Sequence, residues 1–360
     1  MIKNALVFQK TYSYDDVMLV PQFNKISSRW DVNLTYNYRN GLNLDVPIFS
    51  SPMDTVTDWE MARTLVQNFG AAPVIHRYNT PEKQLESLTK AVFHLGSDKE
   101  HTIGCAIGNS RDYLERLRTL LSSETVKPAF INIDVAHGHS QSTFEAVEKV
   151  RQYWPGHLMV GNVCTFEAAR ELANIGVDSL RVGVGSGSAC STRIVCGHGV
   201  PMISAIEWAS NGVAFSKNKD VAIIADGGIK NSGDAVKAIA AGAHGVMLGS
   251  ILSGTSETPG DVVIHEGRES KEYRGMASKA ALEAYKGSTA KHSSFEGVST
   301  FVPYKGETSE VLLTFLKGLR SGFTYSGSHT IDILQAKAVF TEISANGMRL
   351  SHPHHKAQDE

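Results

Sequence analysis

Residues 221–250 read VAIIADGGIKNSGDAVKAIAAGAHGVMLGS, and this stretch decides the fold class. It contains an apolar run, Val221–Ala225, then an amphipathic segment, Ser232–Ala241, and a second apolar run that begins at Gly245. Gly242 follows the amphipathic segment directly, in the position where glycine often ends a helix. The stretch therefore predicts a strand, a helix and a strand in succession, the unit from which parallel sheets are built.

Apolar runs of the same kind recur along most of the chain. They are short and rich in β-branched residues, and most start about 20 to 30 residues apart, although the sixth and seventh start about 40 apart. Amphipathic stretches lie between them. Eight such units predict an α/β fold of the (β/α)8 TIM-barrel type in preference to a doubly wound sheet. The runs are Val46–Ser50, Ala72–His76, Thr102–Ile107, Ala129–Val135, Leu158–Val163, Ser179–Val184, Val221–Ala225 and Gly245–Leu248.

Polar residues gather where these runs end. In a TIM barrel, catalytic groups lie on the loops that follow the strands, so this clustering predicts a site at that end of the barrel. The alternative interpretation is that the residues only form turns. The polar strand ends are Ser50–Asp54, His76-Arg77, Gly108-Asn109, Asp134–His139, Gly161-Asn162, the loop 183–196, Asp226–Gly228 and Gly249-Ser250.

The loop 183–196, after the sixth run, is rich in Gly and Ser and contains Cys190. Alternate glycines leave the backbone free to approach a ligand closely. Ser188 and Thr192 place hydroxyl groups on either side of the cysteine. This setting predicts a nucleophilic thiol, whereas the alternative is a buried cysteine that packs as a small apolar residue. Thr192 is a candidate for moving a proton at the reacting centre, and Glu296 is its candidate acid or base partner, or else a solvated surface residue.

Two further loops indicate a phosphate site. Asp226-Gly227-Gly228 follows the seventh run and Gly249-Ser250 the eighth, which is the usual phosphate-binding position in a TIM barrel. Backbone N–H groups there can bind a dianion. A carboxylate such as that of Asp226 suits sugar hydroxyls. Phosphate and ribose together predict a nucleotide, and simple turns are the alternative.

Composition excludes several classes of protein. The chain has 360 residues, a formal net charge of −2 and a pI near 6.7, which argues against nucleic acid or an anionic membrane as the main partner. No apolar stretch of 18 residues and no signal peptide is recognised, so we expect a cytoplasmic protein. The cysteines are expected to be reduced thiols, with Cys196 structural. They are Cys105, Cys164, Cys190 and Cys196.

We expect residues 1–360 to form one catalytic barrel domain with two additions. The stretch 257–309 is less periodic and is interpreted as a flap or lid over the site, or else as a disordered surface loop. Residues 340–360 are interpreted as an extended C-terminal arm, although a frayed end is the more common outcome for such a tail.

Five motifs in one order carry a resemblance to a known family. From Tyr14 to Pro353 the chain resembles the IMP dehydrogenase/GMP reductase family. The resemblance implies a (β/α)8 barrel, usually a homotetramer, in which Cys190 attacks C2 of a purine nucleotide and forms a thioimidate. The motifs are the Cys190 loop with Thr192, residues 50–57, residues 134–140, residues 225–229 and Tyr273–Met276.

The resemblance also assigns binding residues. The nucleotide would be held by Ser51, Met53, Ser188, Asp226, Gly227, Gly228, Gly249, Ser250, Tyr273, Gly275 and Met276. The nicotinamide cofactor would face Asp134, Asn162, Arg181 and Gly183. Gly185, Gly187 and the carbonyl of Cys190 resemble the family's loop for a monovalent cation, potassium.

Several segments resemble the reductase branch. The dehydrogenases use a long flap with an Arg-Tyr pair to activate water, but the residues between Met276 and Glu296 contain no Arg. The segments 284–287, 296–297 and 319–327 look like those of reductases. The CBS regulatory domain, usually inserted after strand two in dehydrogenases, is missing, because only about 25 residues separate His76 from Thr102. The expected activity is NADPH-dependent reduction of GMP to IMP and ammonia, catalysed by Cys190, Thr192 and Glu296.

Other segments resemble the dehydrogenase branch, namely Arg274–Met276, residues 302–306 and residues 346–354. The alternative activity is therefore oxidation of IMP to XMP with NAD. The same chemistry on a modified purine is a further alternative, as is a nucleotide-binding protein without turnover. The choice between NADH and NADPH is not readable from any motif.

Overall fold

The computed structural model describes residues 9–96, 101–110, 112–286 and 294–351. At its centre lies a sheet of eight parallel strands, with neighbours in the order β4-β11-β10-β9-β8-β7-β6-β5. The eight predicted runs and these strands coincide, and the predicted α/β barrel is confirmed. The strands are β4 Ile48–Ser50, β5 Val74–Ile75, β6 Gly104–Ile107, β7 Phe130–Asp134, β8 His157–Val163, β9 Ser179–Val182, β10 Ala222–Asp226 and β11 Gly245–Leu248.

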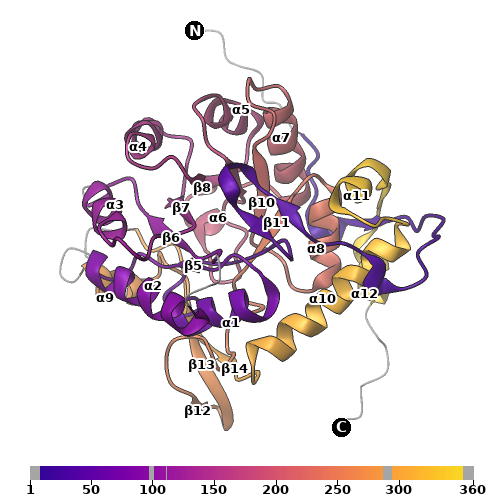
Figure 1. Ribbon diagram of the computed structural model, residues 1–360. Helices are drawn as coiled ribbons and strands as arrows, with labels where there is room; N and C mark the ends of the chain where they lie inside the picture. The colour runs from indigo at the N-terminus through magenta and orange to yellow at the C-terminus, as the bar shows by residue number, and fades with distance from the viewer. Residues whose placement is uncertain (1–8, 97–100, 111, 287–293, 352–360) are drawn as a thin grey trace.

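The sheet closes between its first and last strands. Phe49 of β4 forms a parallel bridge with Ala72, the residue that begins the second apolar run. The amide of Ala72 donates to the carbonyl of Ile48 at 2.9 Å, and the amide of Ser50 donates to the carbonyl of Ala72 at 3.3 Å. Figure 1 shows the resulting ring of strands with the helices arranged around it.

Helices cover the outside of the barrel, and local sequence sets their ends. In α8, for example, the side chain of Asn231 accepts from the amide of Asp234, and Gly242 follows the helix with φ +117°. The wide interval between the sixth and seventh runs holds two helices, α6 and α7. The helices of the barrel are α1 Trp59–Phe69, α2 Pro81–Leu95, α3 Tyr113–Leu121, α4 Gln141–Arg151, α5 Phe166–Asn174, α6 Thr192–Val195, α7 Met202–Ala214 and α8 Ser232–Ala240.

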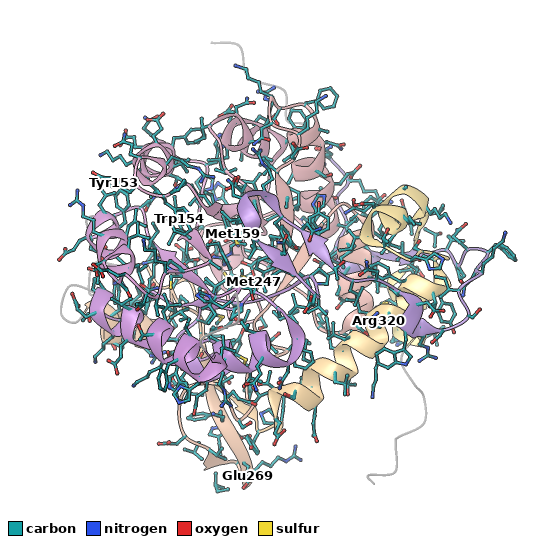
Figure 2. All side chains as sticks on the ribbon, viewed as in Figure 1. Tyr153, Trp154, Met159, Met247, Glu269 and Arg320 are labelled. Carbon is teal, nitrogen blue, oxygen red and sulfur yellow. The ribbon has the colours of Figure 1, made fainter. Side chains whose placement is uncertain are left out.

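Apolar side chains fill the barrel at the end where the strands begin. Phe49 and Phe130 pack edge to face there, at 6.0 Å between ring centroids. Figure 2 shows Met159 and Met247 inside the ring of strands. A short hairpin covers this end; it consists of β2 Tyr36–Asn37 and β3 Asn43–Leu44, which η3 Arg39–Gly41 joins, and η2 Arg29–Asp31 precedes it in the chain. A solid interior leaves the opposite end, where the strands finish, for the site.

The stretch after β11 is a small antiparallel sheet with one helix. It consists of β12 Val263–His265, β13 Arg268–Arg274 and β14 Ser299–Pro303, with α9 Lys279–Lys286 between the last two strands. The idea of a disordered loop is therefore wrong for its described part. A two-residue turn with positive φ, Glu266 and Gly267, joins the first two strands, and this Glu-Gly pair was an available hairpin signal. Figure 1 shows β12 to β14 projecting from the barrel edge.

The two ends of the described chain meet. Turn η1 Tyr14–Asp16 precedes β1 Val17–Leu19, which pairs antiparallel with β15 Phe340–Glu342. The tail up to Ser351 is thus an ordered arm and not a frayed end, while residues 352–360 lie outside the described ranges. The arm contains α12 Ala345–Leu350, and two further helices precede it, α10 Thr308–Tyr325 and α11 Ile331–Lys337. Within the described ranges, no helix is both long and apolar enough to cross a bilayer.

Candidate active site

A cavity of about 260 Å³ opens at the end of the barrel where the strands finish. Every residue that the sequence assigned to catalysis, nucleotide, cofactor or cation lines this cavity. They come from the ends of β7, β8, β9, β10 and β13, from the loops after β4, β9, β10 and β11, and from the segment between β13 and β14. The loops therefore converge as the barrel prediction requires.

Three side chains form a hydrogen-bonded chain at the candidate nucleophile. Cys190 is exposed to the cavity, and its Sγ donates to Thr192 Oγ1 at 3.2 Å. Thr192 Oγ1 in turn donates to Glu296 Oε2 at 2.8 Å. A thiol, a hydroxyl and a carboxylate in this order can pass a proton between the sulfur and the carboxylate. Glu296 is therefore not a solvated surface residue.

Backbone pairing brings Glu296 to the cysteine loop, although 104 residues separate it from Thr192. The carbonyl of Glu296 accepts from the amide of Ser191 at 2.9 Å, and Gly297 bridges Cys190. Gly275 must be a glycine here, because a Cβ would lie 2.6 Å from the carbonyl oxygen of Ala189. The segment between β13 and β14 is thus fastened to the catalytic loop.

The structural role expected for Cys196 is wrong. The residue is exposed at the end of α6, and the nearby carboxylate of Glu296 raises the pKa of its thiol. The single turn of α6 places Cys196 four residues after Thr192, on the same side of the helix. That spacing was the available signal, but it has meaning only once Thr192 to Val195 are known to be helical.

The side of the cavity where the sequence predicts a phosphate, called the phosphate side below, is built around glycines. Gly228 has φ +76°, a conformation that other residues rarely adopt. At Gly249 a Cβ would lie 3.1 Å from Ser51 Oγ and 3.5 Å from Met53 Sδ, so a side chain would fill the space between these groups. The hydroxyl of buried Tyr273 lies in the same place, 3.4 Å from a Cβ at Gly249 and 3.1 Å from the Ser188 hydroxyl, and burial raises the pKa of Tyr273.

A row of charges crosses the mouth of the barrel. Arg181 is buried, and its Nη1 donates to Asp134 Oδ1 at 2.6 Å while its Nη2 donates to Asp226 Oδ2 at 2.7 Å. Asn162 Nδ2 donates to the same oxygen of Asp226 at 2.8 Å. One Asp226 oxygen is therefore engaged within the protein.

Asp134 is held as an anion by its neighbours. Burial raises the pKa of Asp134, but the charges of Arg181 and then Arg77 outweigh burial, so the pKa lies below its ordinary value. Burial likewise lowers the pKa of Arg181, and the two aspartates more than reverse that effect. Asp134 and Arg181 are therefore both charged at neutral pH.

The sequence analysis missed three side chains around this row. Arg77, noted only as a polar strand end, donates through Nε to Asp134 Oδ2 at 3.3 Å. Tyr78 lines the cavity next to it. Ser186 Oγ donates to the carbonyl of Asp226 at 2.9 Å. The position of Arg77 directly after β5 was the available signal.

The candidate cation loop offers carbonyl oxygens, which suit an alkali cation. Gly185 has φ +69°, and the carbonyl of Gly187 also accepts from the amide of Cys190 at 3.0 Å. No cluster of His, Cys, Asp and Glu suited to a metal ion occurs among the residues that the structure describes. A carbonyl site requires no such cluster.

Comparisons with known proteins agree with this geometry. A model of the IMP dehydrogenase / GMP reductase domain matches residues 11–354. An inosine-5′-monophosphate dehydrogenase of Borreliella burgdorferi is 33% identical over 97% of this chain and 98% of its own. That of Bacillus subtilis is 44% identical over 70% of this chain and 52% of its own. A GMP reductase from Trypanosoma brucei, solved with guanosine 5′-monophosphate, superposes with a TM-score of 0.86 at 26% identity, covering 97% of this chain and 99% of the other.

Replacing Arg181 by Met should destabilise the protein in a pH-dependent way. The variant leaves Asp134 buried with only Arg77 beside it, and we expect a loss of about 3 kcal/mol in the free energy of unfolding at pH 7.5. In the folded variant, burial then raises the pKa of Asp134 above its value in the unfolded chain. The folded variant therefore loses stability as pH rises and Asp134 gives up its proton. Urea unfolding at pH 7.5 and pH 4.5 should therefore show a smaller deficit at the lower pH.

The matched control is Lys230→Met. It removes an exposed ion pair with Asp15, in which the two side chains are 67% and 47% exposed. This change should alter the free energy of unfolding by less than about 1 kcal/mol at either pH. An Arg181→Met deficit that is equal at both pH values would contradict the assigned role of Asp134.

Proposed function

The chain belongs to the IMP dehydrogenase/GMP reductase family, and we propose that it is a GMP reductase, an NADPH-dependent oxidoreductase that converts GMP to IMP and ammonia. The observation that carries this proposal is the hydrogen-bonded chain from Cys190 through Thr192 to Glu296. Loss of an amino group requires a proton at the departing nitrogen, and this chain holds an acid or base next to the nucleophile.

In the first half of the reaction, the Cys190 sulfur adds to C2 of the guanine ring. Its proton passes through Thr192 to Glu296 and from there to the 2-amino group. The C2–N bond then breaks, ammonia leaves with that proton, and a thioimidate joins Cys190 to C2. Thr192 touches both the sulfur and the carboxylate, so it is placed to carry the proton in either direction.

In the second half, a bound nicotinamide dinucleotide would supply a hydride to C2 of the thioimidate. The C2–S bond would then break, the sulfur of Cys190 would take a new proton from solvent by way of Glu296 and Thr192, and IMP would leave. Asp134, Asn162, Arg181 and Gly183 would face the dinucleotide. Asp134 and Arg181 fit this task because they form an ion pair in the lining of the cavity that also contains Cys190.

The nucleotide would lie on the other side of the cavity. Its phosphate would contact the backbone of Gly227, Gly228, Gly249 and Ser250 and the hydroxyl of Ser188, and its base would lie near Met53 and Met276. Potassium would bind carbonyls of Gly185, Gly187 and Cys190 and hold the loop. The proposed assembly is a homotetramer.

IMP dehydrogenase is the second candidate function. The curated relatives cited above carry that name, and Arg274-Gly-Met resembles the dehydrogenases. Arg274 pairs with Asp54 at 2.5 Å, a contact that fastens the end of β13 to the loop after β4. It therefore has a structural task that either activity would need. The absence of Arg from residues 277–295 weighs against activation of water by the flap.

The proposal predicts the outcome of two absorbance assays at 340 nm. With GMP and NADPH, absorbance should fall and ammonia should be released in equal amount. With IMP, NAD and potassium, absorbance should stay constant. A rise in the second mixture and none in the first would identify a dehydrogenase. An unchanged absorbance in both mixtures would contradict the proposal. It would indicate either a modified purine as substrate or a protein that binds nucleotide without turnover.

Glu296→Gln should slow the reaction about 100-fold or more, because the amide can no longer take up or release a proton. The rate to measure is kcat in the GMP and NADPH assay. Glu283→Gln is the matched control, since Glu283 lies on α9 with its side chain 54% exposed and pairs only loosely with Lys279 at 3.9 Å. A Glu296→Gln rate close to that of Glu283→Gln would remove Glu296 from the mechanism.

Cys190→Ala should abolish turnover while leaving GMP affinity within about threefold, since a thioimidate cannot form without the sulfur. The dissociation constant of GMP is measured by calorimetry and turnover by absorbance. Cys164→Ala, which removes a half-buried thiol outside the cavity lining, serves as the control. Residual turnover in Cys190→Ala at a tenth of the wild-type rate would exclude the covalent route.

A further inference from the structure

An aromatic contact joins the segment between β13 and β14 to the barrel. Tyr285, on α9, stacks on Tyr78, which follows β5 and lines the cavity; the ring centroids are 4.6 Å apart and the planes are inclined by 25°. The hydroxyl of Tyr285 also donates to Asp112 Oδ2 at 3.3 Å, just before α3. In Figure 1, α9 lies on the side of the barrel where α2 and α3 begin.

The ring of Tyr78 has a second neighbour. The guanidinium of Arg77 lies over it, 5.3 Å from the ring centroid, and Arg77 Nε donates to Asp134 Oδ2. A cation over an aromatic face is attracted by the ring. Contacts therefore run without a break from Tyr285 through Tyr78 and Arg77 to Asp134, which forms part of the row of charges across the barrel.

The two places that Tyr285 contacts, the turn with Tyr78 and the residue Asp112, are both bound by one buried cation. Arg116 is 2% exposed, and its Nη2 donates to the carbonyl of Asn79, the residue after Tyr78, at 2.6 Å. Nη2 also pairs with Asp112 at 3.5 Å, and Nη1 donates to Gln84 at 3.0 Å. Arg116 thus fixes the turn that carries Tyr78 relative to Asp112, which accepts the hydrogen bond from Tyr285. The two groups that Tyr285 contacts are therefore held in place by the barrel itself.

We propose that Tyr285 is a positioning residue for the dinucleotide: by stacking on Tyr78 it holds Arg77 against Asp134. The proposal rests on the proposed function only in placing the dinucleotide beside Asp134. Arg181 fixes one oxygen of Asp134, and Arg77 fixes the other. Without the Tyr285 ring, one face of Tyr78 loses its cover and Arg77 loses its fixed support. The phosphate side, built on Gly249, Ser188 and Tyr273, belongs to other segments and should be unaffected.

Two variants of Tyr285 test this inference on the full-length protein. Tyr285→Ala should raise the KM and the dissociation constant of NADPH about three- to tenfold, while the dissociation constant of GMP changes less than about twofold. Tyr285→Phe keeps the ring and loses only the hydroxyl, so it should restore NADPH affinity to within about twofold of wild type. NADPH binding is followed by its own fluorescence and GMP binding by calorimetry.

Tyr153→Ala is the matched control. Tyr153 also lies under an arginine, with the Arg118 guanidinium 5.5 Å from its ring centroid, but it is 47% exposed at the outer surface near the end of α4 (Figure 2). Its loss should leave both dissociation constants unchanged. Unchanged NADPH affinity in Tyr285→Ala would overturn the proposal. So would equal weakening of GMP binding, which indicates general loss of structure, or a Phe variant as impaired as the Ala variant.

The assays above separate this inference from the proposed function. If the wild-type protein oxidises IMP with NAD, the proposed function fails, and the same variants are compared by the KM and dissociation constant of NAD. If it turns over neither pair, dinucleotide affinity alone decides. In each case the ratio between Tyr285→Ala and Tyr285→Phe, measured against Tyr153→Ala, supports or refutes the positioning role.

Discussion

The salt bridges of Arg181 with Asp134 and Asp226 organise the site. Burying a guanidinium is unfavourable unless it is paired, and here carboxylates from two different strands pair with its two terminal nitrogens. Arg181 reaches Asp134 across β8, where Gly161 leaves room, because a Cβ there would lie 2.3 Å from Arg181 Cβ. The three strand ends are thereby locked together. The resulting row of charges also holds Arg77, which follows β5 and pairs with Asp134.

Close approach of backbones is the second constraint. The cysteine loop and the segment near Glu296 contact each other through main-chain hydrogen bonds, so any side chain between them would separate Cys190 from its proton partner. A Cβ at Gly275 or Gly297 would press against the carbonyl of Ala189, at 2.6 and 3.1 Å. Glycines here are therefore a condition for the hydrogen bond between Thr192 and Glu296, since only they let the two loops approach so closely.

Local sequence patterns predicted most of the barrel and the loops around its cavity, whereas lining residues such as Arg181, Tyr273 and Met276 were predicted only from the family resemblance. Buried parallel strands are continuous apolar runs, and polar residues at their ends mark the loops, so both signals are local. The errors concern residues whose roles depend on other segments. The surroundings of Cys196 depend on α6 and on Glu296. Those of Tyr285 depend on the turn that carries Tyr78, more than 200 residues earlier in the chain. Buried Arg116 was missed for the same reason, because nothing near it in sequence reveals that it supports Tyr78 and Asp112 together.

The arrangement around Cys190 suits a reaction in two halves. The proton partners, Thr192 and Glu296, come from α6 and from the segment before β14, whereas the residues next to Asp134 come from β5, β7 and β9. In the proposed reaction a proton must move while ammonia departs, and a hydride donor must then be held still. These two tasks belong to separate segments. The ion pair of Asp134 and Arg181 can therefore stay fixed while a proton moves along the hydrogen bond between Thr192 and Glu296. The two parts meet at the sulfur of Cys190, the one atom that both halves of the reaction require.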